Sequence, residues 1–252
     1  MQILDDVYLV GSGRTGLGLS DEYDCHIYLL DGGDEAALID AGSGVAVEPL
    51  LRNIAAHGFA LSKVRTLILT HAHADHGGGS AALRARLGCR VLVSEAEAAI
   101  LETADAAASG LNVALPSGIY PPGYTMPPCP VDRRLRDGDT VTVGRYTLQV
   151  IATPGHSPGS LCYLATVAGR QVLFSGDVVQ FCPVAGQTGW ISLLNCPGTS
   201  LDAYRQSVRK LAGRGVDVLL PGHRLFTLKN GQRVIDVVIK GFEGLAIPKS
   251  VV

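Results

Sequence analysis

Three histidines and an aspartate stand within the run Thr-His-Ala-His-Ala-Asp-His at residues 70–76. So many nitrogen and oxygen ligands at one place are best explained by a site for a divalent transition metal. His71 and His73 lie on the same side of an extended segment, so we expect them to bind one ion. Asp75 and His76 follow where the chain turns into three glycines, so we expect them to face a second ion. The run therefore predicts a metal site with room for two ions.

Further ligand residues follow short apolar runs later in the chain. They are His156 in Pro-Gly-His, Asp177 in Ser-Gly-Asp and His223 in Pro-Gly-His. The neighbouring glycines let the backbone turn sharply and bring a ligand close to an ion. Ligands at strand ends are held by a rigid sheet, while the loops that carry them leave room for substrate. The apolar runs are residues 148–151, 172–174 and 216–220.

In its order and spacing, this set of residues resembles the metallo-β-lactamase-fold hydrolase superfamily over nearly the whole chain. The resemblance implies an α/β, four-layer αββα sandwich with a dinuclear metal site at one edge of its two sheets. It implies a first metal on His71, His73 and His156, a second on Asp75, His76 and His223, and Asp177 bridging both. Asp40, in Ile-Asp-Ala-Gly, matches the family's first motif, where the carboxylate orients the metal loop without binding metal.

Composition agrees with an enzyme that folds as a single metallo-β-lactamase-like domain over residues 1–252. Residues of hydrophobic type make up 47% of the chain, enough for a large core. The 21 basic and 23 acidic residues nearly balance, so nothing in the charge favours a nucleic-acid partner. The basic cluster Arg133, Arg134 and Arg136 is surrounded by aspartates and is predicted to be a solvated loop.

No segment of the sequence predicts export or membrane insertion. The first residues lack a basic region followed by a long apolar stretch, and no apolar run is long enough to cross a bilayer. We therefore expect a cytoplasmic protein. In a reducing compartment its 6 cysteines should be mostly free thiols, buried as small hydrophobic residues.

Apolar periodicity predicts alternating strands and helices in two similar halves. In the first half we expect strands at residues 3–10, 25–30, 36–39, 64–69 and 91–93, and helices at 47–54, 81–87 and 95–108. In the second half we expect strands at residues 140–143, 147–151, 161–165 and 171–174, a helix capped by Ser200 and an apolar helical stripe from Ile235 to Leu245.

Two long segments without a regular pattern, residues 110–130 and 180–199, are predicted to form the walls of the substrate pocket. Their aromatic side chains are candidate substrate contacts: Tyr120, Tyr124, Phe181 and Trp190. Residues 11–16 fit the dinucleotide-binding pattern Gly-x-Gly-x-x-Gly. The segment that follows them is short, contains glycine and leads into a strand. Because a dinucleotide site needs a helix there, we reject this interpretation.

Two ions that share a carboxylate typically sit about 3.5–4 Å apart and lower the pKa of a water held between them. The resulting hydroxide would attack a carbonyl, and Asp75 is the candidate catalytic residue that orients it and shuttles its proton. Zinc suits such nitrogen and oxygen sites best, with iron or manganese as replacements.

The substrate is expected to be a neutral, partly apolar small molecule with an ester, thioester or lactone bond. Quorum-signal lactonases carry a tyrosine where this chain has Gln180, which counts against that subfamily. The alternatives are an iron-dependent oxidoreductase of the same fold, similar to persulfide dioxygenases, and a hydrolase of the β-lactamase or glyoxalase II type. The sequence does not predict an oligomeric state.

Overall fold

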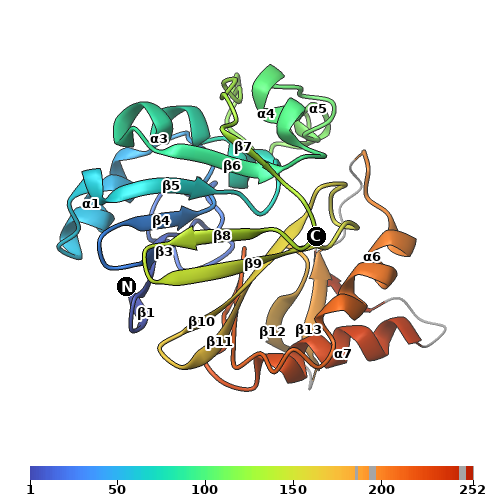
Figure 1. The fold of residues 1–252 in the computed structure, drawn as a ribbon. Helices are drawn as coiled ribbons and strands as arrows, with labels where there is room; N and C mark the ends of the chain where they lie inside the picture. The colour runs from blue at the N-terminus through green and yellow to red at the C-terminus, as the bar shows by residue number, and fades with distance from the viewer. Residues whose placement is uncertain (185–186, 193–196, 244–247, 252) are drawn as a thin grey trace.

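The computed structural model describes residues 1–184, 187–192, 197–243 and 248–251 (Figure 1). Its first sheet follows the chain order from β1 to β7. The first strands pair antiparallel, whereas β4 to β7 run parallel. The strands of this sheet are β1 (Gln2–Leu4), β2 (Val7–Gly11), β3 (Ile27–Asp31), β4 (Ala36–Ile39), β5 (Val64–Ile68), β6 (Arg90–Ser94) and β7 (Arg133–Leu135).

A second sheet has the order β14-β11-β10-β9-β8, in which β11 and β14 are parallel and the other pairs antiparallel. Its strands are β8 (Thr140–Val143), β9 (Tyr146–Ala152), β10 (Leu161–Val167), β11 (Arg170–Gly176) and β14 (Val218–Pro221). A small sheet of β12 (Gln180–Val184), β13 (Gln187–Ser192) and β15 (Ser250–Val251) lies beside it.

Helices form the outer layers. Figure 1 shows α1 and α3 on the opposite side of the molecule from α6 and α7. The α-helices are α1 (Glu48–Ala56), α2 (Ala74–Gly77), α3 (Ser80–Leu87), α4 (Ala98–Thr103), α5 (Leu111–Ala114), α6 (Leu201–Val208) and α7 (Gly231–Glu243). Short 3-10 helices are η1 (Leu61–Lys63) and η2 (Arg209–Leu211). No helix among the described residues is long and apolar enough to cross a membrane.

The layers are held together by separate hydrophobic clusters, and β3 shows how one strand serves two of them. Ile27 and Leu29 pack with residues of α1 and α3, whereas Tyr28 and Leu30 pack between the two sheets. Successive side chains of a strand point to opposite faces, so a strand with both faces buried reads as continuously apolar. A further cluster joins the second sheet to α6 and α7. These layers are the predicted αββα sandwich, which is confirmed.

Several predicted elements need correction. Residues 3–10 are not one strand, because the chain turns at Asp6, which has a left-handed φ of 69°. The helix predicted at residues 95–108 ends at Thr103, where Ala104 takes a left-handed φ of 54°. The basic cluster predicted as a loop contains β7, whose exposed Arg134 pairs with Glu102. Part of the segment 180–199 is the hairpin β12–β13. The end of the predicted stripe at Leu245 lies outside the described residues.

Other local predictions hold. Strand β8 has the predicted bounds, and the side chain of Ser200 accepts a hydrogen bond from the backbone N–H of Ala203 at the start of α6. Cys25, Cys89, Cys129, Cys162 and Cys182 are free thiols, while Cys196 lies outside the described part of the chain.

Candidate metal centre

The carboxyl ends of five strands deliver the predicted ligands to one place. Asp40 follows β4, and His71 follows β5 with the short helix α2 just beyond it. From the second sheet, His156 follows β9, Asp177 follows β11 and His223 follows β14. Parallel neighbouring strands end at the same edge of a sheet, so residues distant in sequence meet there.

Imidazole nitrogens of His71, His73 and His156 converge in a buried cluster. His71 Nε2 lies 3.1 Å from His73 Nδ1, and His156 Nε2 lies 3.2 and 3.0 Å from these two atoms. These separations also allow N–H···N hydrogen bonds, but one shared ion would accept the lone pairs of all three nitrogens at once. Three nitrogens that each bind zinc at about 2.0–2.1 Å are spaced in this way.

A second cluster contains Asp75, His76 and His223. Nε2 of His223 lies 3.0 Å from Asp75 Oδ2 and 3.3 Å from His76 Nε2. His76 is fully buried, whereas Asp75 and His223 are partly exposed. The exposed side of this cluster leaves a route by which a small molecule can approach.

The carboxylate of Asp177 faces both clusters. Its Oδ2 lies 3.6 Å from Nε2 of His156, in the first cluster. In the second, Oδ2 lies 3.5 Å from His223 Nε2 and Oδ1 lies 3.4 Å from His76 Nε2. Gln180 donates a hydrogen bond from Nε2 to Oδ1 of Asp177 and so fixes the orientation of this carboxylate.

The outward ring nitrogens of three histidines contact groups that fix the imidazole tautomer. Nδ1 of His156 donates to the carbonyl of Ser192 at 2.7 Å, and Nδ1 of His76 donates to Asp40 at 2.9 Å. A carbonyl or carboxylate only accepts, so Nδ1 carries a proton in both rings. Burial keeps His156 neutral, so its Nε2 keeps a lone pair toward the cluster. His71 Nδ1 contacts the hydroxyl of Thr70, which donates to Asp40.

Asp40 therefore lies beneath the clusters and acts through other residues. It accepts hydrogen bonds from the backbone N–H and hydroxyl of Thr70 and from His76. Every one of these contacts orients the loop that carries His71 to His76. The thiol of Cys25 lies close to Asp40 and His76, but burial raises its pKa strongly, so it stays protonated and ligates poorly.

Electrostatics differ between the clusters. Burial lowers the pKa of His73 to about 3, and burial also lowers the pKa of His71 and His156, so all three are neutral. Burial opposes the charge of Asp75, but His76 and His223 hold its pKa far below the usual value. This carboxylate is therefore ionised across the neutral range. Neutral imidazoles and charged carboxylates are the forms that bind divalent metal.

Sequence reasoning missed two residues that support the ligand loops. Glu97 is a buried carboxylate that accepts from the backbone N–H of Ala72 at 2.6 Å and of Gly159 at 2.8 Å. It thus ties the loop of His71 and His73 to the loop of His156. The only sequence signal for Glu97 was its position shortly after β6. The hydroxyl of Thr15 lies 2.8 Å from His223 Nδ1. Its sequence signal was the glycine-rich segment 11–16, which brings Thr15 to His223.

A cavity of about 430 Å³ opens beside the clusters, and its lining includes His73, Asp75, Asp177 and His223. Among the predicted pocket aromatics, Tyr120 lines this cavity, and its hydroxyl donates to Asp75 Oδ1 at 3.3 Å.

The other predicted pocket aromatics contribute less directly to this cavity in the described structure. Tyr124 stacks behind Tyr120 and donates to the carbonyl of Ser43. Phe181 packs on the cluster between the second sheet and α6 and α7, while Trp190 donates from Nε1 to the carbonyl of Cys182. Of the predicted pocket segment 180–199, residues 185–186 and 193–196 lie outside the described structure.

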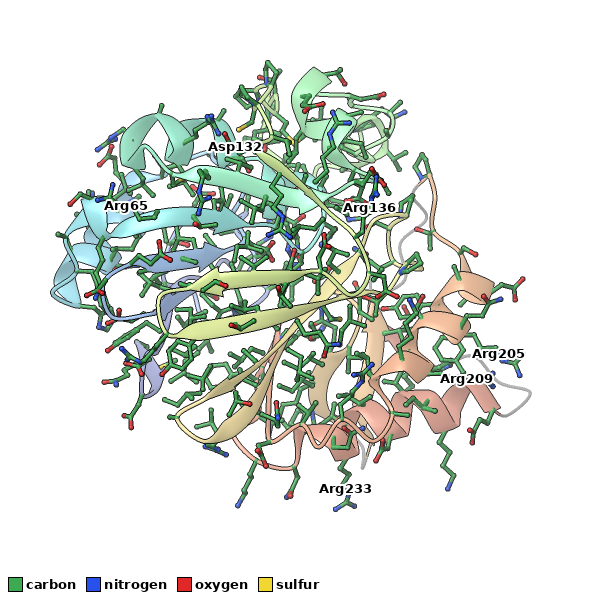
Figure 2. All side chains as sticks on the ribbon, in the orientation of Figure 1. Arg65, Asp132, Arg136, Arg205, Arg209 and Arg233 are labelled. Carbon is green, nitrogen blue, oxygen red and sulfur yellow. The ribbon has the colours of Figure 1, made fainter. Side chains whose placement is uncertain are left out.

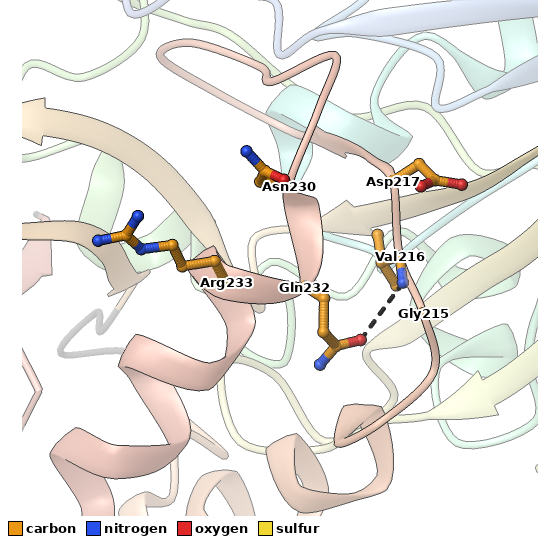
Figure 3. A pocket seen from close by; sticks show the side chains of 6 residues that line it. All are labelled: Gly215, Val216, Asp217, Asn230, Gln232 and Arg233. Carbon is orange, nitrogen blue, oxygen red and sulfur yellow. Dashed lines mark hydrogen bonds between the residues drawn. The ribbon is translucent and has the colours of Figure 1, made fainter.

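Figure 3 shows a separate surface pocket between the segment before β14 and the start of α7. Its wall is held by Gln232, whose Oε1 accepts a hydrogen bond from the backbone N–H of Val216. The lining residues include neither histidine nor cysteine, so this pocket lacks the groups that carry chemistry in the cavity beside the clusters.

An αββα sandwich with histidine and aspartate clusters at its sheet edge defines the class of protein as an enzyme of the metallo-β-lactamase fold. The family profile of the metallo-beta-lactamase superfamily matches residues 20–223, a range that contains every one of these cluster residues. The chain belongs to this superfamily.

Several curated relatives carry hydrolase names. The chain is 31% identical over 219 residues to the acyl-coenzyme A thioesterase MBLAC2 of Bos taurus, covering 79% of this chain and 72% of that protein. It is 31% identical over 198 residues to the atrochrysone carboxyl ACP thioesterase of Aspergillus fumigatus, covering 78% of this chain but only 49% of that protein. A hydroxyacylglutathione hydrolase of Anaeromyxobacter dehalogenans is 31% identical over 205 residues, which is 79% of this chain and 61% of that protein.

Solved structures give the same fold. A metallo-beta-lactamase of Cronobacter sakazakii with a HARLDQ motif has a TM-score of 0.67 at 29% identity, covering 88% of this chain and 77% of that one. The subclass B3 metallo-beta-lactamase BJP-1 of Bradyrhizobium japonicum has a TM-score of 0.66 at 28% identity, covering 88% and 76%.

Proposed function

We propose that the chain is a dinuclear metal-dependent hydrolase. His71, His73 and His156 would hold one ion, Asp75, His76 and His223 a second, and Asp177 would bridge them. The observation that carries this proposal is the position of the Asp177 carboxylate, within 3.4–3.6 Å of histidine nitrogens from both clusters. Zinc is the ion we favour, because the donors are nitrogen and oxygen atoms in compact groups.

When bound, the ions would supply a water of lowered pKa and polarise the carbonyl that it attacks. The protein's own part is to orient the water and take up its proton. Asp75 suits this role because its carboxylate stays ionised and is turned toward the cavity by His223 and Tyr120. Asp40 and Glu97 contribute by holding the ligand loops in place.

We propose a thioester as the substrate, ahead of an ester or a lactone. The support is the names of the relatives, which act on acyl-coenzyme A, on an acyl carrier protein and on hydroxyacylglutathione. The cavity agrees with an acyl compound because Leu111, Val113 and Ile119 line it close to the clusters.

Hydrolysis of a matched panel tests this function. Zinc-loaded protein should hydrolyse a thioester faster than the oxygen ester and the lactone of the same acyl group, with release of thiol as the readout. Removal of the metal with a chelator should abolish the reaction and addition of zinc should restore it. Oxygen uptake by iron-loaded protein, with no hydrolysis of any member of the panel, would replace this proposal with an oxidoreductase.

A further inference from the structure

The cavity beside the clusters combines apolar residues with two arginine residues in its lining. Val113 and Ile119 are 42% and 47% exposed, which is unusual for large apolar side chains that lie together. Arg14 and Arg224 also line the cavity. A ligand that matches both features has an apolar part and an anionic part.

Arg224 lies in an uncommon backbone conformation. Its φ is 66°, in the left-handed region that a residue with a Cβ seldom adopts. Two hydrogen bonds hold the residue there: its N–H donates to the carbonyl of Thr15 at 2.9 Å, and its carbonyl accepts from His26 Nε2 at 3.0 Å. Strained residues that the surroundings fix in this way concentrate at functional sites.

The guanidinium of Arg224 has no ion pair or hydrogen bond with any residue in the described ranges. Arg14 differs, since it pairs loosely with Glu22 at 3.6 Å and donates to the carbonyl of Ile119. The other charged groups of the cavity, Asp75 and Asp177, face histidines. The cavity lining therefore contains a cation whose charge no described carboxylate balances.

Ser109 gives an independent sign of a ligand. Ser109 is only 4% exposed, and it lines the same cavity. Its hydroxyl has no hydrogen-bond partner among the described residues. A buried hydroxyl without a partner costs about 1–3 kcal/mol, so a polar group of a bound molecule would satisfy it.

From these observations we propose that Arg224 is a specificity residue that binds an anionic group of the substrate, with Arg14 beside it, while the acyl part lies against Val113 and Ile119. The inference rests on the proposed hydrolase function and adds the substrate class, a thioester whose thiol part carries carboxylate or phosphate. It replaces the neutral substrate that the sequence led us to expect. Guanidinium groups suit both anions because their donors match two oxygens at once.

The test compares three thioesters with one acyl group: the coenzyme A thioester, with phosphates; the glutathione thioester, with carboxylates; and the neutral N-acetylcysteamine thioester. The wild-type protein should show a higher kcat/KM for an anionic thioester than for the neutral one. Arg224→Gln should lower the ratio of anionic to neutral kcat/KM about 10- to 100-fold, which is the range for losing a charge-assisted hydrogen bond.

The control is Arg205→Gln, on α6 at the edge of the molecule in Figure 2, which removes the same charge away from the cavity. It should leave the ratio unchanged. If Arg224→Gln lowers this ratio for the coenzyme A thioester alone, the anion is assigned as phosphate. If it lowers the ratio for the glutathione thioester alone, the anion is assigned as carboxylate. An unchanged ratio for both in Arg224→Gln would overturn the inference, although hydrolysis itself would still support the proposed function.

If no thioester is turned over, the proposed function fails, and binding decides the inference separately. Calorimetric titration of the coenzyme A and glutathione thioesters into wild type and Arg224→Gln then provides the readout. Weaker binding of either by the variant supports the anion site, and equal binding of both contradicts it.

Discussion

Whether a histidine binds a metal depends on which of its two nitrogens carries the proton. In this chain the proton position is set by neighbouring groups that can only accept a hydrogen bond. They are the carbonyl of Ser192 for His156 and the carboxylate of Asp40 for His76. The sequence predicted the histidines as metal ligands, and the resemblance to the superfamily predicted that Asp40 orients their loop. It contained no sign that Ser192 would turn its carbonyl toward His156, because that contact depends on how the hairpin β12–β13 packs.

Asp40→Ala should weaken metal binding. The variant removes the acceptor of His76 Nδ1 and of the Thr70 N–H, so both the tautomer and the loop lose their restraint. We expect a loss in zinc affinity of about 10- to 100-fold, measured by competition with a chelator. Asp34→Ala, an exposed aspartate, is the matched control. Equal zinc affinity in the Asp40 variant and this control would rule out the positioning role.

Asp75→Asn should slow hydrolysis while most of the site stays in place. The amide keeps the shape of the side chain but takes up no proton, so turnover should fall by about 10²–10⁴-fold. In the wild type the pKa of Asp75 lies below its usual value, so this carboxylate stays ionised as the pH falls through neutrality. The activity of the wild type should therefore rise with pH through the ionisation of the attacking water. Full turnover by the variant would refute the proton-handling role.

At the scale of elements, periodicity predicted the strands that carry the ligands, because both their faces are buried and they read as continuous apolar runs. It failed where the chain reverses within a few residues. Asp6 and Ala104 adopt left-handed conformations. Glycine or asparagine usually signals such a conformation in a sequence, and neither stands at these positions. The hairpin β12–β13 was missed because its residues lack regular alternation and β13 is paired by β15 from the far end of the chain.

Gly222→Ala should damage the second cluster selectively. A Cβ at this position would lie 2.6 Å from Cε1 of His76 and also meet the carboxylate of Asp177, so the loop after β14 has to move. Overpacking of this kind costs roughly 1–3 kcal/mol, which a thermal unfolding scan detects. We expect a lower melting temperature and loss of the ion that we propose for His76 and His223. Retention of wild-type metal content in this variant would show that the loop adapts and that the ligands do not depend on the close approach.

Across the whole molecule, ligands from both halves of the chain meet only because the two sheets pack face to face. Each half supplies histidines to an edge of its own sheet, and the apolar cluster around Tyr28 and Phe174 joins the sheets. The resemblance to the superfamily gave this arrangement in advance, since all the ligand residues appear in order. The resemblance did not predict that Arg14 and Arg224 line the cavity. Both lie in loops, and apolar periodicity does not predict the contacts of loops.

The central claim is that two ions occupy neighbouring sites in one chain. Metal-free protein, titrated with zinc, separated from unbound metal by gel filtration and analysed for zinc per chain, tests it most directly. The account predicts two zinc ions per chain at saturation, with thioester hydrolysis rising as they bind. Saturation at one ion per chain or fewer would contradict the dinuclear site.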